Sequence, residues 1–421
     1  MATSWPVRRT RATRNAGFAA LVLTSAVATE ARVLQVGPGR ALARPSDAAR
    51  AAKDGDVVEI DAGVYAGDAA IWTQSELTLR GVGGMAHLRA DGRAAEGKAI
   101  WVLKGDRTKI ESIEFSGAKV SDRNGAGVRL EGSGLTILGC SFHDNENGIL
   151  TSGKPDGDVL IEHSEFGRNG AGDGQTHDLY VGRERSFTLR FCYVHHANVG
   201  HLVKSRARTT RILYNRLSDE ADGRSSLAVD VAEGGDALVL GNLIHQGPAS
   251  ENGIIISYGV EKQVPGSSGT LYVVNNTIVN DRHAGTFVRN ADPSPARLLN
   301  NVLVGPGDIA TGPAIAVRNV VAREFGMLTK IRNLLTGGSQ LLASVTDGGG
   351  NVVTADALLV DRAGFDWHLR PGSPAIDARS AVGAESDSER VPTFEYVHPA
   401  NGRPRTLRGA PDAGAYELEA P

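Results

Sequence analysis

The sequence predicts an all-β protein with the fold of a right-handed parallel β-helix, and three observations support this prediction. Short apolar strands recur along most of the chain at intervals of 18 to 34 residues. An asparagine holds the same place in several successive repeats. The 421 residues include 52 Gly but only 5% aromatic residues, which is typical of many short strands joined by tight turns. We therefore expect one solenoid domain of about ten to twelve coils, although this length usually indicates two or three domains.

The repeat is marked by a strand that ends in a polar residue, any residue and an apolar residue. A period in the twenties is typical of stacked supersecondary units. Each unit opens with a second short apolar strand, as at 227–229 and 253–256. Strands of three to five residues cannot each bury a face alone, so we expect stacked coils, about 4.8 Å apart, that share one core. The marked strands end at Phe142, Phe166, Val194, Leu217, Ile244, Ile278, Leu303, Leu335 and Val353.

The polar residue of this signature is an asparagine in six of the repeats, which predicts an asparagine ladder. Stacked Asn side chains can hydrogen-bond to one another and to the turn backbone. Cys140 and Cys192 hold the same place in earlier repeats, with Ser164 between them. The two cysteines should therefore lie two coils apart, about 9.6 Å, whereas a disulfide needs Cα atoms within about 7 Å. We predict two buried free thiols. The predicted ladder consists of Asn215, Asn242, Asn276, Asn301, Asn333 and Asn351.

Residues 1–31 have the pattern of a secretory signal peptide. Four arginines between positions 8 and 14 precede an apolar stretch at 16–27 that is too short to span a membrane. Small residues at 26 and 28 form a cleavage site. We predict a secreted or periplasmic protein with no membrane span after cleavage, and a short membrane anchor is the alternative.

Both ends of a stack of coils must be covered, because open strand edges recruit other chains. An amphipathic helix at 45–53 is expected to cover the N-terminal end. Segments 367–377 and 412–417 are expected to form a C-terminal flap, and we expect a monomer. The predicted parts of the chain are a signal peptide at 1–31, an N-terminal cap at 32–65, β-helix coils at 66–360 and a C-terminal capping tail at 361–421.

Two segments resemble a known superfamily. Residues 37–65 (GPGRALARPSDAARAAKDGDVVEIDAGVY) resemble the opening coil of the pectate-lyase-like β-helix superfamily. Residues 369–377 (LRPGSPAID) and 412–417 (DAGAYE) resemble a tail that is common on its bacterial members. With the coils, the resemblance covers nearly all of the chain after the signal peptide. It implies the fold, whereas lyases, hydrolases, epimerases and phage tailspikes all share this scaffold.

Ionisable side chains concentrate between residues 168 and 261, where the outward positions of consecutive coils form a ledge for a polymer. His177 and His201 open adjacent coils 24 residues apart, so we expect them to be close neighbours. Clustered titratable groups suggest a site. The net charge of -3 gives no basic surface for a nucleic acid, which is not an expected partner. The predicted substrate-binding residues are Arg183, Arg208, Asp178, Asp230, Glu233 and Tyr258.

This mixture of residues suits β-elimination on an acidic polysaccharide that contains uronic acid. An arginine neutralises the carboxylate next to C5, a base takes the C5 proton, and an acid protonates the leaving oxygen. A lysine between arginines suits the base, because its cationic neighbours lower its pKa. The predicted catalytic residues are Lys204 as the base, with His201 or His177 as alternatives, Tyr180 as the acid, and Arg206, or Arg208 in its place, as the carboxylate clamp.

Three other functions stay open. A C5-epimerase would share the base, clamp and acid of a lyase. A carbohydrate-binding or envelope protein without activity would present exposed aromatics, but the tryptophans at 72, 101 and 367 lie outside the cluster. A glycoside hydrolase needs carboxylates that face one gap, but the chain lacks the adjacent Asp-Asp and the Gly-His-Gly of related polygalacturonases. The carboxylates available for hydrolysis are Asp178, Asp219, Glu220, Asp222, Asp230 and Glu233.

No cofactor is required by this chemistry. Calcium is the alternative to an arginine for neutralising the uronate, although the carboxylates match no calcium-loop spacing. A transition-metal site is not expected from His177, His195 and His196, because their spacing matches no standard pattern. The candidate calcium ligands are Asp219, Glu220, Asp222 and Asp230.

Overall fold

The computed structural model describes residue 1 and residues 31–262, 269–323, 345–378 and 388–419. Residues 2–30, which contain most of the predicted signal peptide, lie outside the described residues. From Arg32 onward the chain forms a single unit. In the described ranges no helix is long and apolar enough to cross a membrane.

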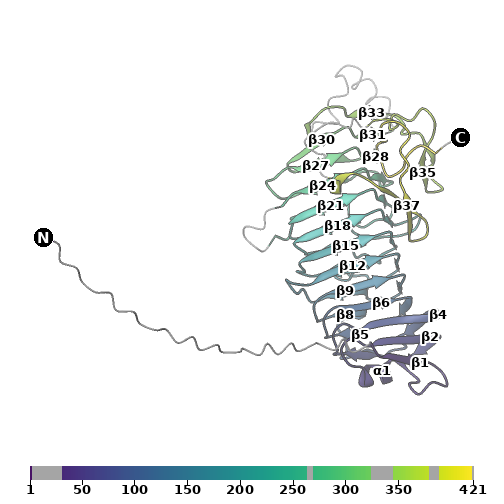
Figure 1. Ribbon diagram of the computed structural model, residues 1–421. Helices are drawn as coiled ribbons and strands as arrows, with labels where there is room; N and C mark the ends of the chain where they lie inside the picture. The colour runs from purple at the N-terminus through teal and green to yellow at the C-terminus, as the bar shows by residue number, and fades with distance from the viewer. Residues whose placement is uncertain (2–30, 263–268, 324–344, 379–387, 420–421) are drawn as a thin grey trace. The chain divides into compact units, whose positions relative to one another are not determined.

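Strands of successive coils pair in parallel, and Figure 1 shows the coils stacked one on another. Each coil contributes one strand to a ten-stranded sheet and two to a 23-stranded sheet. Within the larger sheet, the strands form two columns that meet at β4 (Thr78–Arg89), which pairs with the first strand of both. This is the parallel β-helix that the repeat predicts.

The ten-stranded sheet and the two columns of the larger sheet have the following strands. The ten-stranded sheet contains β3 (Ala70–Trp72), β5 (Ala99–Leu103), β8 (Ala126–Leu130), β11 (Asn147–Thr151), β14 (Leu179–Val181), β17 (Val203–Ser205), β20 (Val229–Val231), β23 (Ile254–Tyr258), β26 (Thr286–Asn290) and β29 (Asp308–Thr311). After β1 (Val33–Val36), β2 (Val57–Ala66) and β4, column 1 contains β6 (Thr108–Glu111), β9 (Leu135–Leu138), β12 (Asp158–Glu162), β15 (Ser186–Arg190), β18 (Thr209–Leu213), β21 (Asp236–Leu240), β24 (Leu271–Val274), β27 (Ala296–Leu299), β30 (Ala314–Val317) and β32 (Thr346–Asp347). Column 2 contains β7 (Ile113–Ser116), β10 (Ser141–His143), β13 (Glu165–Gly167), β16 (Tyr193–His195), β19 (Arg216–Ser218), β22 (Leu243–Gln246), β25 (Thr277–Asn280), β28 (Val302–Val304), β31 (Val320–Ala322) and β33 (Val352–Thr354).

The strands form because apolar and polar residues alternate, so that one set faces a shared core. In column 2 the inward residues Phe115, Phe142 and Phe166 stack in register. Their ring centroids are 4.9 and 4.7 Å apart, which is close to the spacing of neighbouring strands. All three rings are fully buried. The short strands therefore share a continuous core along the stack, as expected.

The asparagine ladder is present and differs from the prediction at one place. Each side-chain amide donates to the amide oxygen of the next Asn at 2.9 to 3.0 Å. After Asn301 the ladder continues through Asn319, which bonds directly to Asn351. We expected Asn333 in that place, and it lies outside the described residues. The segment that begins at Asn319 has the same polar-x-apolar signature and follows Asn301 by 18 residues. We assumed a longer interval here, from Asn301 to Asn333.

Both cysteines are buried free thiols, as predicted. The backbone N–H of Cys140 donates to Ser164 Oγ at 3.1 Å, and that of Cys192 donates to Asn215 Oδ1 at 2.8 Å. The thiols therefore stand in the column that the asparagines continue. Burial raises the pKa of each to about 12, so both are protonated and unreactive at neutral pH.

In the part of the chain that the structure describes, one α-helix lies between β1 and β2. Helix α1 (Pro45–Ala51) begins with Pro45 at its first turn, and the backbone N–H of Arg44 donates to the Asp47 carboxylate at 3.0 Å. It ends at Ala51, two residues earlier than predicted, because Ala52 is extended. Pro45, Ala48 and Ala49 are buried, and Figure 1 shows the helix next to β1.

The C-terminal segment lies along the side of the coils. It contains the antiparallel pairs β34 (Leu359–Asp361) with β35 (Asp366–Leu369) and β36 (Phe394–Val397) with β37 (Asn401–Pro404), and a 3-10 turn at Ser388–Arg390. Trp367 and Tyr396 join one cluster with Leu243, Val279 and Val302 of column 2. We expected this tail at the open end of the stack. The outward face of column 2 becomes largely apolar from β22 onward, and the tail covers that face instead.

Candidate active site

Tyr180, Lys204 and Asp230 are the middle residues of β14, β17 and β20, and the strand register places them side by side. Their neighbours along the strands, such as Val203 and Val229, belong to the core. Because side chains alternate along a strand, these three project from the outer face of the ten-stranded sheet. Lys204 and Asp230 are nevertheless largely shielded from solvent, since neighbouring side chains cover them.

Lys204 lies between two carboxylates. Its ammonium nitrogen is 3.3 Å from Asp230 Oδ2 and 2.6 Å from Glu261 Oε1. The Lys204 side chain is only 9% exposed. Burial raises the pKa of Asp230 above its usual value, although Lys204 opposes this shift. The ion pair of Lys204 and Asp230 is therefore largely shielded from water.

Arg206 lies beside Lys204 and is held from three directions. Its Nε donates to the Tyr180 hydroxyl at 2.8 Å, and Nη1 donates to Glu233 Oε1 at 2.9 Å. Its Nη2 donates to Glu261. Arg183 makes two further hydrogen bonds to Glu233, at 2.9 and 2.6 Å. Tyr180 and Glu233 therefore fix the plane of the Arg206 guanidinium.

Glu261 is a site residue that sequence reasoning missed. It follows β23, and its two carboxylate oxygens bridge Lys204 and Arg206. Burial favours its neutral form, but the two cations hold the pKa of Glu261 below the usual value. Its side chain is 40% exposed. The only signal in the sequence was a carboxylate in the turn after a strand of the predicted ledge.

His177 and His201 are stacked, with ring centroids 4.6 Å apart, as their position on adjacent coils predicts. The backbone N–H of His201 donates to His177 Nδ1 at 3.0 Å, so His177 carries its proton on Nε2. Burial, together with the nearby Lys204, lowers the pKa of His201 to about 3 and that of His177 well below its usual value. Both rings are therefore neutral at physiological pH. His201 Nε2 lies 3.6 Å from Asp230 Oδ2.

Comparison with known proteins agrees with this architecture. A family model described as the right-handed β-helix region matches residues 63–223. Among solved structures, the crystal structure of pectate lyase Pel9A is similar with a TM-score of 0.54 and 12% sequence identity, covering 93% of this chain and 98% of that chain. The chain has the right-handed parallel β-helix fold of the pectate lyases. No curated protein matches its sequence. At 12% identity this likeness shows the fold and does not by itself establish the reaction.

Three residues predicted to bind substrate lie elsewhere in the β-helix. Asp178 is fully buried and accepts two hydrogen bonds from Asn169, which in turn accepts one from Asn145. Asp178 therefore ends a second internal ladder rather than facing the ledge. Tyr258 is 1% exposed and donates its hydroxyl proton to Gly235 O at 2.5 Å. Because Ser257 is the outward residue of β23, its neighbour Tyr258 faces the core. Arg208 is exposed, and it donates to Pro155 O rather than joining the cluster.

Asp219 and Glu220, which were considered for calcium binding or hydrolysis, do not share one gap with Asp230. Asp219 is buried and bonds to Ser250 and to the backbone of Ser225. Glu220 accepts from Arg216 and from the Tyr193 hydroxyl, beside column 2. Asp230 lies on the ten-stranded sheet instead. These three carboxylates do not fit a common calcium ion, and they do not form the paired acid and base of a hydrolase.

His195 and His196 belong to the outer face of column 2, whereas His177 lies beside the ten-stranded sheet. His195 Nε2 is 3.1 Å from Glu165 Oε1, and His196 Nε2 is 3.0 Å from Asp222 Oδ1. The Nδ1 atoms of the two rings are 2.7 Å apart. They therefore do not combine with His177 in one site.

Proposed function

We propose that the protein is a lyase that cleaves a uronic-acid polysaccharide by β-elimination on the outer face of the ten-stranded sheet. The observation that carries this proposal is the position of Glu261, whose carboxylate bridges Lys204 and Arg206. A uronate carboxylate has the same planar shape and charge, so a cradle that holds Glu261 also suits the acidic group of a substrate. The name of the similar structure, a pectate lyase, supports the same class of reaction.

A polyanion along the coils would meet further cations on the same row. Arg129 lies three strands before Lys204 in this outward row, and Arg289 lies three strands after it. At about 4.8 Å per strand, each arginine is about 14 Å from Lys204. Arg129 is partly exposed and Arg289 is exposed. This spacing favours an extended polymer over a small ligand.

In the proposed reaction the substrate carboxylate displaces Glu261 and pairs with Arg206. Neutralising this carboxylate makes the neighbouring C5–H bond more acidic, because the carbanion that forms is stabilised. Lys204 takes the C5 proton, the C4=C5 double bond forms, and the bond from C4 to the leaving oxygen breaks. Tyr180, whose hydroxyl is held by Arg206, donates a proton to that oxygen.

Lys204 suits the base better than either histidine does. An imidazole with a pKa of about 3, as in His201, is neutral but accepts protons weakly. Lys204 must first lose its ammonium proton, and Asp230 lies 3.3 Å away with a raised pKa to receive it.

The test is the product formed when the purified protein is mixed with a panel of uronic-acid polymers, with and without calcium. β-Elimination generates an unsaturated uronate with a new ultraviolet absorbance and a new chain end. A hydrolase gives new ends without the absorbance, and an epimerase exchanges the C5 hydrogen with solvent deuterium without either. Absorbance that rises with time supports the proposal. A flat trace on every polymer, at enzyme concentrations where binding is saturated, overturns it.

The proposal includes export to the periplasm or the exterior, where such polymers are found. It rests on the charged and apolar pattern of residues 1–31. Expression of the full chain in a bacterial host tests it, with the N-terminus of the recovered protein read by mass spectrometry. A mature N-terminus between residues 29 and 32 in the periplasmic fraction is expected, and an intact chain in the cytoplasm contradicts export.

A further inference from the structure

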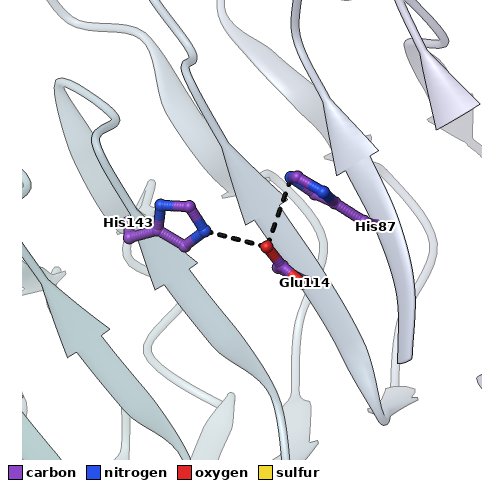
Figure 2. Close-up of side chains that lie close together, drawn as sticks. All are labelled: His87, Glu114 and His143. Atoms are coloured by element: carbon purple, nitrogen blue, oxygen red, sulfur yellow. Dashed lines mark hydrogen bonds and ion pairs between the residues drawn. The ribbon is translucent and has the colours of Figure 1, made fainter. Parts of the chain in front are cut away.

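A second group of ionisable residues lies on column 2, on a different sheet from the proposed lyase site. His87, Glu114 and His143 come from β4, β7 and β10, which are three successive strands. His87 pairs in register with Glu114, and His143 pairs with Ser116, two residues further along β7. Figure 2 shows the two imidazole rings approaching the Glu114 carboxylate from either side. Neighbouring strands of a stacked sheet hold all three side chains.

The distances among these side chains fit one metal ion. The Nε2 atoms of His143 and His87 are 3.0 and 3.4 Å from the same oxygen, Glu114 Oε1. One donor atom from each residue lies within 4.8 Å of the other two. Donors bound at about 2.1 Å and at tetrahedral angles lie about 3.4 Å from one another around a zinc ion. The side chains therefore need only small movements to coordinate an ion together.

A carboxylate outside the three donors orients His143, as in metal sites of proteins. His143 Nδ1 lies 2.6 Å from Asp144 Oδ2, so a carboxylate holds the ring and leaves Nε2 pointing at Glu114. Arg168 in turn contacts Asp144 at 3.2 Å. Such carboxylate–histidine pairs fix the ring and raise its strength as a ligand.

The donor set indicates which metal would bind. Two imidazoles and one carboxylate suit zinc and related divalent transition ions, whereas calcium and magnesium prefer oxygen donors alone. The three side chains are between 20% and 29% exposed, so a fourth position faces solvent. Ser116 Oγ, 2.7 Å from His87 Nε2, lies beside the donors. An open fourth position is typical of zinc sites that bind water or an exogenous oxygen ligand.

We infer that His87, Glu114 and His143 form a binding site for one zinc-like divalent ion, with a coordination position open to water or an oxygen ligand. The same face provides an internal comparison. Glu165 and His195 repeat the glutamate–histidine pair two coils later, at 3.1 Å. There the residue that corresponds to His87 is Ser141, so a third donor is missing. The inference does not depend on the proposed lyase reaction.

Calorimetric titration of the chelator-treated, untagged protein with zinc chloride tests the inference. One equivalent is expected to bind, and binding is expected to weaken at least a hundredfold in His87→Ala and Glu114→Gln. Asp144→Asn should weaken binding by about tenfold to a hundredfold, as removal of an outer partner usually does. His195→Ala is the matched control and should bind zinc like the wild type. Circular dichroism checks that each variant is folded.

Cobalt gives a second readout that a loss of folding would not imitate. Cobalt bound by two imidazoles and a carboxylate in a tetrahedral site has strong visible absorption bands, which should be present in the wild type and in His195→Ala but absent in His87→Gln. Absence of stoichiometric zinc binding, or equal binding by the wild type and the folded His87 and Glu114 variants, overturns the inference.

Discussion

Glu261→Gln tests whether the two cations that hold Glu261 also bind the carboxylate of the substrate. The Glu261 carboxylate lies 2.6 Å from Lys204 Nζ and bonds to Arg206. A glutamine keeps the size of the side chain but removes the negative charge. Because substrate must displace this group, the variant should bind an acidic oligosaccharide more tightly.

The magnitude follows from the contacts. A hydrogen bond to a charged group contributes about 1.5–3 kcal/mol when shielded, and exposed ion pairs contribute about 0.2–1 kcal/mol. Glu261 is 40% exposed, while Lys204 and Arg206 are 9% and 14% exposed, so an intermediate cost of about 1–2 kcal/mol is reasonable. Since 1.4 kcal/mol corresponds to tenfold in affinity, the dissociation constant should fall by about fivefold to thirtyfold.

Calorimetric titration with a uronate oligosaccharide measures this change without requiring turnover. The matched control is Glu251→Gln, because Glu251 pairs with exposed Arg224 outside the cluster and should not affect affinity. The affinity of the wild type should also fall as the salt concentration rises. The affinity of Glu261→Gln should fall more steeply, because this variant lacks the carboxylate that pairs with Lys204 and Arg206. An unchanged or weaker affinity in a folded Glu261→Gln protein would refute displacement of Glu261 by substrate.

Three further predictions concern the core. Asn242→Ala removes buried hydrogen bonds to two neighbouring asparagines and should lower the free energy of unfolding by about 2–5 kcal/mol in urea, whereas Asn401→Ala, at an exposed position of β37, should change it by less than about 0.5 kcal/mol. Burial raises the pKa of Asp178 well above its usual value, so the folded state binds a proton that the unfolded state releases. The free energy of unfolding should therefore fall as pH rises above the unfolded-state pKa of 3.8, and Asp178→Asn should remove that part of the pH dependence. Cys140 and Cys192 should resist a thiol reagent in the native protein and react as two free thiols after denaturation.

Contrary results would be specific for each of these predictions. Equal urea stability of Asn242→Ala and the wild type would show that the ladder contributes little. The same pH dependence in Asp178→Asn and the wild type would mean that Asp178 is not protonated on folding. Rapid labelling of either thiol in the native state would contradict the burial of the cysteine column.

The repeat could be predicted because a β-helix imposes one physical rule on every coil. Inward positions must be apolar or pair with the same position in the next coil, as Phe142 does with Phe166 and Asn242 with Asn276. The same rule identifies the outward positions, so Tyr180 and Lys204 could be placed together from the register alone. Errors arose at strand ends, where one residue of offset turns a side chain inward, as at Tyr258.

Contacts made by turns could not be predicted in this way. Glu261 reaches Lys204 across 57 residues from a turn whose conformation no periodic pattern determines. The cluster of His87, Glu114 and His143 was missed for another reason. His87 precedes the core residue Leu88 on β4, and Glu114 precedes the core residue Phe115 on β7. Both strands follow the same alternation as β10, but the repeat that we identified began at Cys140. Extending the register two coils toward the N-terminus would have brought the three residues together.

The reaction rate of Lys204→Ala on the polymer that the wild type cleaves most rapidly tests the proposed function most directly. Loss of a general base usually costs about a hundredfold to ten-thousandfold in rate. Lys109→Ala is the control, because Lys109 pairs with Glu111 on the outer face of column 1, away from the ten-stranded sheet. We predict that the unsaturated product forms at least a hundredfold more slowly with folded Lys204→Ala and at the wild-type rate with Lys109→Ala. Product formation at the wild-type rate by Lys204→Ala would contradict the assignment of the base and the site.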